Sequence, residues 1–449
     1  MSLVPPSIPE LDAAERETID SYYRYVDPAG ALFLEFLTDD FVEYEAEGAI
    51  VRDRHGRSYI DGMTTGGVFG LGHRNPRVID AVKAQLDRMP LTAKIGFNQP
   101  HAELSRLLAE ITPGDLKYTF AVSSGTEAIE SAIKLARLTT QRPGIVSTNN
   151  SFHGMSIGCS SVSGVPYWRE GFFPLLEGCQ LVPYGDVNAL ERFIGPLTAA
   201  VLVEVVQSAS GCTVAPPGYL ERMRELCDKH GTLMIVDEIQ TAFGRTGKMF
   251  AVEHAGVVPD ILCLGKFLGG GVLAAGACVY NERVHRASVQ RPAFNNTTWT
   301  GNPLVCTAAV AAIRTVIDEN LVEHSAKLGH YLRAGLERLK SKHPMVVDLK
   351  GLGLMQTFVL ADPRQGLPLV MTLIQKERIL LFSPVHAPTM VRVNPPQIVD
   401  EAFIDDMLAR IDRALTFVGS LDSDGLNRFT IQLNSDLQER QRARAQTQG

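Results

Sequence analysis

The most reactive candidate in this chain is Lys266, which lies in the segment PDILCLGKFLGGG at residues 259–271. The apolar run just before it predicts a buried strand, so the amine is expected just beyond the carboxyl end of that strand. Glycines at positions 265 and 269–271 leave room for a bulky group to approach the backbone. A single strand-end lysine is usually a solvated surface residue, so its meaning depends on the neighbouring motifs.

Two other segments end in the same way. TLMIVDEIQ, at residues 232–240, predicts an apolar strand that ends in Asp237 and Glu238. KYTFAVSSGTEAIE, at residues 117–130, predicts a strand that runs through Ser-Ser-Gly-Thr into a helix, and Ser124 and Glu127 have capping-box spacing. Ligands of parallel sheets bind beyond the carboxyl ends of the strands. We therefore expect an amine, an acid and a glycine-containing turn at one sheet edge.

A strand that ends in Asp-Glu is also typical of a magnesium site in nucleoside triphosphatases. That interpretation requires a G-x-x-x-x-G-K-[ST] loop, and the two nearest candidates, at residues 244–249 and 265–271, have the wrong spacing. A G-x-G-x-x-G dinucleotide fingerprint after a strand is also absent. The sequence therefore argues against both nucleotide-binding classes.

The three segments suit pyridoxal phosphate (PLP). A lysine amine can form a Schiff base with its aldehyde. An aspartate against the ring nitrogen keeps that nitrogen protonated, which makes the ring an electron sink. Backbone amides at a helix start can hold its phosphate, and Gly125 would let the backbone approach it.

Composition narrows the class of protein. The chain has 449 residues, 45% of them hydrophobic and 21% charged, with a net charge of −7, which gives no electrostatic case for nucleic-acid binding. The seven cysteines are scattered, which favours reduced thiols over disulfides or a metal site. The sequence shows no secretory signal and no apolar run of membrane-spanning length. We expect a cytoplasmic enzyme without a metal, a membrane or a nucleic-acid partner.

The secondary-structure pattern predicts an α/β fold. Strands and amphipathic helices alternate from about residue 76 to 318, which predicts a mostly parallel sheet with helices on both faces. Residues 48–62 read as a hairpin, and residues 319–419 as a smaller α+β domain. We expect residues 1–75 to join that smaller domain and residues 420–449 to form a poorly ordered tail.

On these motifs, roughly residues 30–417 resemble the class III (ω-type) aminotransferases of PLP fold type I, especially their putrescine (diamine) aminotransferase branch. That resemblance implies a large PLP-binding domain with a seven-stranded type of sheet. The motifs that carry it are Ser124-Gly125-Thr126-Glu127-Ala128, Phe152-His153-Gly154, Glu204 with Gln207, Asp237-Glu238-Ile239-Gln240, Gly244-Arg245-Thr246-Gly247, Lys266 and Thr298-Trp299-Thr300-Gly301-Asn302-Pro303-Leu304.

The resemblance implies a catalytic role for two residues. Lys266 would carry the cofactor and move the substrate proton, and Asp237 would pair with the ring nitrogen. Gln240 would bond the ring hydroxyl, with Glu204 orienting Gln240. His153 is expected near the cofactor, as a hydrogen-bonded support of the site.

Other residues are implied to hold the cofactor or the substrate. Ser124, Gly125 and Thr126 would hold the phosphate, and Phe152 and Ile239 would pack on the two ring faces. Thr298 would reach the phosphate of a neighbouring subunit, which makes the active unit a homodimer or a dimer of dimers. Arg392 would grip a substrate carboxylate, with Val68 and Phe69 lining the pocket. We expect Glu238 to make a structural ion pair.

One segment departs from the family. Where relatives read E-P-V-Q-G-E-G-G, this chain has Glu204-Val205-Val206-Gln207-Ser208-Ala209-Ser210-Gly211. In many relatives the second glutamate pairs with the arginine that binds the substrate carboxylate, and here Ala209 replaces that glutamate. The implied function is transamination between an amino acid or amine and a keto acid, aldehyde or ketone, by ping-pong half-reactions. A decarboxylating transaminase, racemase or aminomutase is the alternative, and a catalytically silent binding protein is a remote one.

Overall fold

The computed structural model describes residues 11–291, 297–427 and 429. Its larger part is built on a seven-stranded sheet with the order β4-β12-β11-β10-β7-β5-β6. Strand β12 is antiparallel to both neighbours, and the other neighbouring pairs are parallel. Across the sheet the strands are Tyr118–Val122 (β4), Gly276–Tyr280 (β12), Ile261–Leu264 (β11), Leu233–Asp237 (β10), Thr198–Glu204 (β7), Gly144–Thr148 (β5) and Cys179–Val182 (β6).

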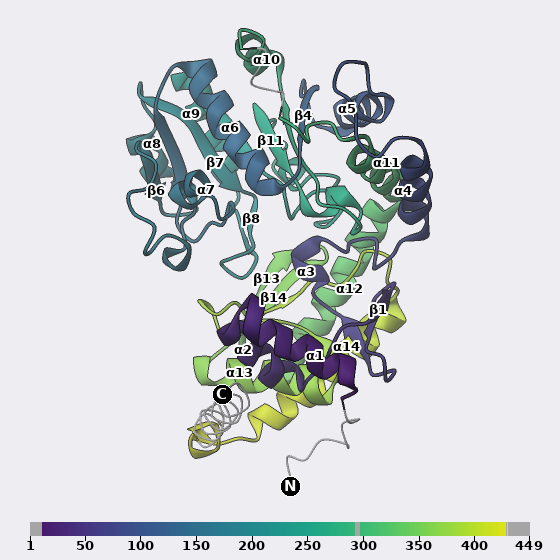
Figure 1. Ribbon diagram of the computed structural model, residues 1–449. Helices are drawn as coiled ribbons and strands as arrows, with labels where there is room; N and C mark the ends of the chain where they lie inside the picture. Colours follow the sequence, from purple (N-terminus) through teal and green to yellow (C-terminus); the bar gives the residue numbers. More distant parts are fainter. Residues whose placement is uncertain (1–10, 292–296, 428, 430–449) are drawn as a thin grey trace.

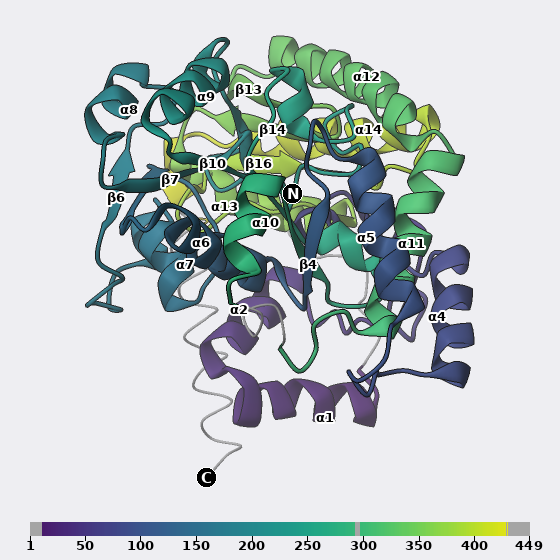
Figure 2. The ribbon, with the colours of Figure 1, turned by 90° about the horizontal axis from the view of Figure 1, so that it is seen from above.

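Helices cover both faces of this sheet because its strands are apolar on both sides. In β10, Leu233 and Ile235 face the core under α6, whereas Met234 and Val236 face the core under α9. Seen from above, α6 and α9 lie on opposite sides of β7 and β10 (Figure 2). The helices of this part are Pro76–Arg88 (α4), Gln99–Ile111 (α5), Gly125–Thr140 (α6), Ile157–Val162 (α7), Val187–Phe193 (α8), Tyr219–His230 (α9), Glu282–Ser288 (α10) and Pro303–Asp318 (α11).

The smaller part combines strands from both ends of the chain. The predicted hairpin is present as β2 (Ile50–Arg52) and β3 (Ser58–Asp61), and β3 also pairs in parallel with β15 (Ile379–Leu380). A second sheet has the order β13-β14-β16. Its strands are Val346–Leu352 (β13), Met355–Leu360 (β14) and Met390–Val393 (β16).

Five helices pack around these strands, in one body that lies apart from the seven-stranded sheet (Figure 1). They are Ala13–Ser21 (α1), Pro28–Thr38 (α2), Leu321–Lys342 (α12), Gly366–Met371 (α13) and Glu401–Gly419 (α14). The core of this part includes buried side chains of α12, α14 and β14, such as Leu332, Ile411 and Phe358. The N-terminal strands therefore belong to the same body as the C-terminal elements.

The exact domain boundaries at residues 75, 318 and 419 stay predictions. Of the predicted tail, residues 423–427 are helical and Leu426 packs into the core of the smaller part, whereas residues 430–449 lie outside the described chain. None of the helices in the described ranges combines the length and the apolar character needed to cross a membrane.

Candidate active site

Asp237 is the best anchored acid of the site. It is the last residue of β10, lies opposite Glu204 of β7 in the sheet, and is buried. His153 Nδ1 lies 2.7 Å from its Oδ2, and the backbone amide of Ile239 donates to its Oδ1 at 3.0 Å. A carboxylate that accepts two such hydrogen bonds is held in one orientation.

Lys266 lies close to this acid. It follows β11 by two residues and begins a short 3₁₀ turn, Lys266–Gly269, with a left-handed φ of +44°. Its Nζ donates to Gln240 Oε1 at 2.7 Å. Burial lowers the pKa of this amine to about 8, although the Asp237 carboxylate opposes the shift. A buried lysine with such a pKa is partly neutral near neutral pH and can act as a nucleophile or a base.

Glu204 does not orient Gln240, which corrects the sequence prediction. Its Oε2 accepts the backbone amide of Phe152 at 3.1 Å, whereas Gln240 Oε1 accepts a hydrogen bond from Lys266 Nζ. Burial raises the pKa of Glu204 to about 7. Glu204 therefore fixes the Phe152 loop beside the site, and desolvation favours its neutral form.

Glu238 makes no ion pair among the described residues, so that expectation is also wrong. The side chain is fully buried, and its oxygens accept from the Thr241 hydroxyl and, at 2.7 Å, from the amide of Val252. Burial raises the pKa of Glu238 to about 7. Glu238 therefore holds together the segment that follows β10, and it is not among the residues that line the cavity described below.

The predicted phosphate turn is an N-terminal helix cap. The Ser124 hydroxyl accepts the amide of Glu127 at 3.2 Å, at the start of α6. The return bond runs from the amide of Ser123 to Glu127 Oε2 at 2.6 Å, so the capping box closes one residue earlier than expected. A Cβ on Gly125 would lie 2.8 Å from the Ile239 side chain, which explains the glycine at this close approach.

These groups surround one cavity of about 590 Å³ between the larger and the smaller part. Both parts supply its walls, as expected for a site at a junction. The lining residues are Met63, Thr65, Gly66, Ser124, Gly125, Thr126, Phe152, His153, Gly154, Tyr167, Trp168, Glu204, Val206, Ser208, Ala209, Asp237, Ile239, Gln240, Thr241, Lys266, Phe382, Pro384, Val385, His386 and Arg392.

Arg392 enters this cavity from β16 of the smaller part. Its Nη1 donates to Ser208 Oγ at 3.0 Å, and its Nε is buried without a hydrogen-bond partner. Within the described ranges no carboxylate forms an ion pair with it. Burial lowers the pKa of the guanidinium, which nevertheless stays a cation. The cavity thus contains a cation with free donor capacity.

Three predicted residues lie outside this cavity. The turn Thr64–Gly67 has left-handed φ values and directs Thr65 and Gly66 into the cavity in place of Val68 and Phe69. Phe69 instead stacks on His73 at 3.9 Å, beside a neighbouring cavity. Thr298 is exposed and is not part of the lining in its own chain.

Sequence reasoning missed the aromatic wall of the cavity. Trp168 lies 5.4 Å from the ring of Phe152 and 4.7 Å from that of Tyr167. His386, whose Nε2 lies 3.0 Å from the carbonyl oxygen of Ala209, completes this wall. The signals were weak: an adjacent Tyr-Trp pair in one loop, and a histidine between prolines in SPVHAP, shortly before Arg392.

The cavity fits PLP, the cofactor that the sequence implies. The amides of the first turn of α6 lack intrahelical acceptors and carry the positive end of the helix dipole, which suits a phosphate. Gln240 Nε2 is buried without a partner and lines the cavity, so it can donate to a ring hydroxyl. The anionic Asp237 and the amine of Lys266 lie on the same walls.

Comparisons with known proteins agree with this geometry. A model of the family "Aminotransferase class-III" matches residues 38–415. The chain is 38% identical over 402 residues to the putrescine aminotransferase of Pectobacterium atrosepticum, and the alignment covers 86% of each protein.

Solved structures share the fold over most of the chain. The ornithine aminotransferase from Toxoplasma gondii ME49 matches with a TM-score of 0.84 at 31% identity, covering 91% of this chain and 96% of that one. An S-selective transaminase from Arthrobacter sp. matches with a TM-score of 0.82 at 25% identity, covering 90% and 98%. The predicted family, fold class, cofactor and reaction type are confirmed. The chain belongs to the class-III aminotransferase family and is a PLP-dependent transaminase of fold type I.

Proposed function

We propose that this transaminase takes an α-amino acid as its donor and holds the donor carboxylate with Arg392. The observation that carries the proposal is the buried, unpartnered Nε of Arg392 in the same cavity as Lys266. A buried guanidinium without an anion is unfavourable, and a carboxylate can accept two of its parallel N–H groups. A substrate carboxylate therefore supplies the anion that the cavity lacks.

We assign the contacts of the cofactor to residues that line the same cavity. Asp237 pairs with the ring nitrogen, and Gln240 Nε2 donates to the ring hydroxyl. The phosphate is held by the first turn of α6, whose amides belong to Gly125 and Thr126, with Ser124 as the cap. Phe152 and Ile239 pack on the two ring faces. When bound, PLP serves as the electron sink that stabilises a carbanion at the substrate carbon.

Lys266 moves the proton of the reaction. Its neutral amine takes the proton from the substrate α-carbon at Nζ and returns it to the cofactor side. A pKa near 8 keeps a useful neutral fraction available at neutral pH. Gln240 Oε1, 2.7 Å from Nζ, holds the amine in place beside the cavity. His153 acts through Asp237 and touches no reacting atom.

The aromatic wall favours a substrate with an apolar side chain and disfavours a substrate with a second ammonium group. Among the described residues that line the cavity, the carboxylates are Glu204 and Asp237, and both already accept hydrogen bonds from the protein. A diamine such as putrescine, the substrate that names one relative, would bring a distal ammonium without a carboxylate partner. Tyr167 and Trp168 instead offer a surface for an apolar or aromatic group.

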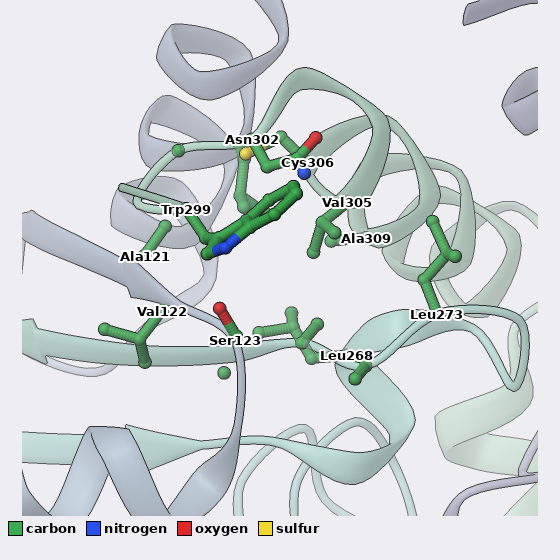
Figure 3. Close-up of a pocket in the computed structure, with 15 residues that line it drawn as sticks. Ala121, Val122, Ser123, Leu268, Leu273, Trp299, Asn302, Val305, Cys306 and Ala309 are labelled. Atoms are coloured by element: carbon green, nitrogen blue, oxygen red, sulfur yellow. The ribbon is translucent and has the colours of Figure 1, made fainter. Parts of the chain in front are cut away.

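We also propose a homodimer in which each subunit completes the site of the other, with Thr298 reaching the neighbouring phosphate. The loop between α4 and α5 exposes Ile95 and Phe97 almost fully, as expected of a contact surface. Near Thr298, a second cavity of about 320 Å³ is almost entirely apolar. In Figure 3 the ring of Trp299, itself more than half exposed, lies across this cavity from Ser123 and Leu268.

We also propose that the protein is located in the cytoplasm. All seven cysteines are free, and six of them are buried, which suits a compartment that keeps thiols reduced.

The test of the substrate proposal compares two donors that differ in the carboxylate alone, alanine and isopropylamine. Arg392→Gln should lower kcat/KM for alanine about 10- to 150-fold, the loss expected for a hydrogen bond to a charged group, and leave isopropylamine unchanged. The isopropylamine reaction is the internal control for folding and cofactor loading. Equal losses for both donors, or no loss for alanine, would refute the carboxylate role. Putrescine outcompeting alanine in wild type would refute the substrate class.

A further inference from the structure

A line of buried contacts continues behind Asp237, away from the cavity. His153 Nδ1 lies 2.7 Å from Asp237 Oδ2, and His153 Nε2 lies 3.3 Å from Ser147 Oγ. Ser147 is the fourth residue of β5, is fully buried, and is not among the residues that line the cavity. Its hydroxyl therefore reaches the site through the imidazole of His153.

The hydrogen-bonding capacities of these groups fix the imidazole. An ionised carboxylate can only accept, so the proton of a neutral His153 must reside on Nδ1. Nε2 then presents a lone pair, and the Ser147 hydroxyl is the donor that faces it. Without that donor, the buried Nε2 would be left without a hydrogen-bond partner, and a rotated ring would become competitive.

The backbone of His153 is held separately. Its amide donates to Ser163 Oγ at 3.0 Å, and Ser163 Oγ in turn donates to the carbonyl of Cys159 at 2.9 Å. These contacts place the backbone of the residue and do not touch the ring. The buried ring is held by Asp237 at Nδ1 and by Ser147 at Nε2, so Ser147 is the second of the two hydrogen-bond partners that set its orientation.

We propose that Ser147 is a positioning residue of the transamination site. Its hydroxyl holds the His153 ring in the orientation in which Nδ1–H donates to Asp237, and so helps to orient the Asp237 carboxylate at the cavity wall. Partners behind a ligand-binding side chain commonly set its orientation and basicity. The inference rests on the proposed role of Asp237 but adds a group on β5 that this role does not require.

The test uses Ser147→Ala, with Ser147→Thr and Ser147→Val as a pair of equal shape that differs in the hydroxyl. Ser160→Ala is the matched control, because Ser160 is a buried serine of α7 and is not among the described hydrogen-bond partners of His153. The first measurement is the ¹⁵N spectrum of the histidine rings in cofactor-free protein, with His153 assigned from His153→Gln. Wild type, Ser160→Ala and Ser147→Thr should show one set of His153 ring signals, with protonated Nδ1 and a hydrogen-bonded Nε2. The variants without a hydroxyl should shift the Nε2 signal towards that of a nitrogen without a hydrogen bond, or show a second set of signals from a rotated ring.

The second measurement is the affinity for PLP together with kcat and KM for alanine. Loss of one hydrogen bond should weaken PLP binding and lower kcat by about 2- to 12-fold each, with a smaller change in KM because Arg392 is untouched. Unchanged imidazole spectra in the Ala and Val variants would overturn the proposal, as would changed spectra with unchanged PLP affinity and kcat. If wild type rejected every amino acid while the spectra and PLP affinity responded as expected, the substrate proposal alone would fail.

Discussion

Arg392 donates through Nη1 to the hydroxyl of Ser208 at 3.0 Å, and no acid takes that position. The next residue, Ala209, is buried and lines the same cavity, and its carbonyl oxygen lies 3.0 Å from His386 Nε2. The partner of the guanidinium is thus a neutral hydroxyl, so the positive charge of Arg392 is not neutralised by this contact and remains available to an anion in the cavity. An acid placed at either position would compete with the substrate carboxylate.

The first prediction places that acid at position 209. Ala209→Glu should pair with Arg392 and weaken the binding of α-amino acids, by about 1–3 kcal/mol for a close charge pair, while helping simple amines. Ala209→Gln is the control, because it has nearly the same volume without the charge. The measurement is kcat/KM for glutamate, alanine and a simple amine. Equal effects of Glu and Gln would show that volume, and not charge, decides.

A second prediction concerns Asp237. Asp237→Asn keeps the volume and an oxygen for His153 but removes the charge beside the ring nitrogen. The first turnover with alanine should slow by an amount equivalent to about 2–4 kcal/mol, the range for comparable electrostatic groups, and PLP affinity should suffer less. Single-turnover kinetics provide the measurement. A first turnover as fast as in wild type would contradict the role.

The pKa of Lys266 predicts how the cofactor-free protein reacts with PLP. Only the neutral amine attacks an aldehyde, and burial lowers the pKa of Lys266 to about 8. The loading rate should therefore rise with pH and level off above about pH 8, whereas an ordinary lysine would continue to gain up to about pH 10.4. Stopped-flow absorbance at a series of pH values measures this curve. Gln240→Leu, which removes the acceptor of the amine, should shift its midpoint, and a midpoint near 10 in wild type would refute the pKa.

Much of the catalytic set could be predicted because its signals are local. Lys266, Asp237 and the turn at Ser124 each follow an apolar strand, and the parallel sheet brings such strand ends to one edge. The pattern required no knowledge of distant contacts. The large sheet and the hairpin of residues 48–62 followed from the same local alternation.

The remainder depended on tertiary geometry that no local pattern reports. Glu204 lies beside Asp237 in the sheet register, and its carboxylate accepts the backbone amide of Phe152; within the described chain it has no hydrogen bond to Gln240. Val68 and Phe69 miss the cavity because the preceding turn is left-handed. Ser147 reads as an ordinary residue of a strand until His153 is folded against it. His386 is brought in by a loop of the smaller part.

Glu238 yields a prediction for stability. Burial raises its pKa to about 7 in the folded protein, above the 4.5 of the unfolded chain, so the fold binds an extra proton between these values. The free energy of unfolding should fall as pH rises from about 5 to 7, by up to about 1.4 kcal/mol per pH unit for this group, and the contribution is lost above pH 7. Glu238→Gln should flatten this slope, because its side chain cannot ionise.

Chemical denaturation at pH 5, 6 and 7 measures that slope. The slope that Glu238→Gln leaves should contain the contribution of Glu204, whose pKa is raised in the same direction. It should also contain opposite contributions from His101 and His254, because burial lowers the pKa of each of these imidazoles. A steeper fall in the variant than in wild type would contradict the assignment.

Transamination that depends on Lys266 can be tested by following the nitrogen of the amino donor. Purified PLP-loaded protein is mixed with ¹⁵N-alanine, separated from free donor, and then given an α-keto acid. We expect stoichiometric ¹⁵N in the new amino acid for wild type and none above background for Lys266→Ala, which loses both the covalent anchor and the proton carrier. Transfer by Lys266→Ala at the wild-type rate would refute the role of Lys266.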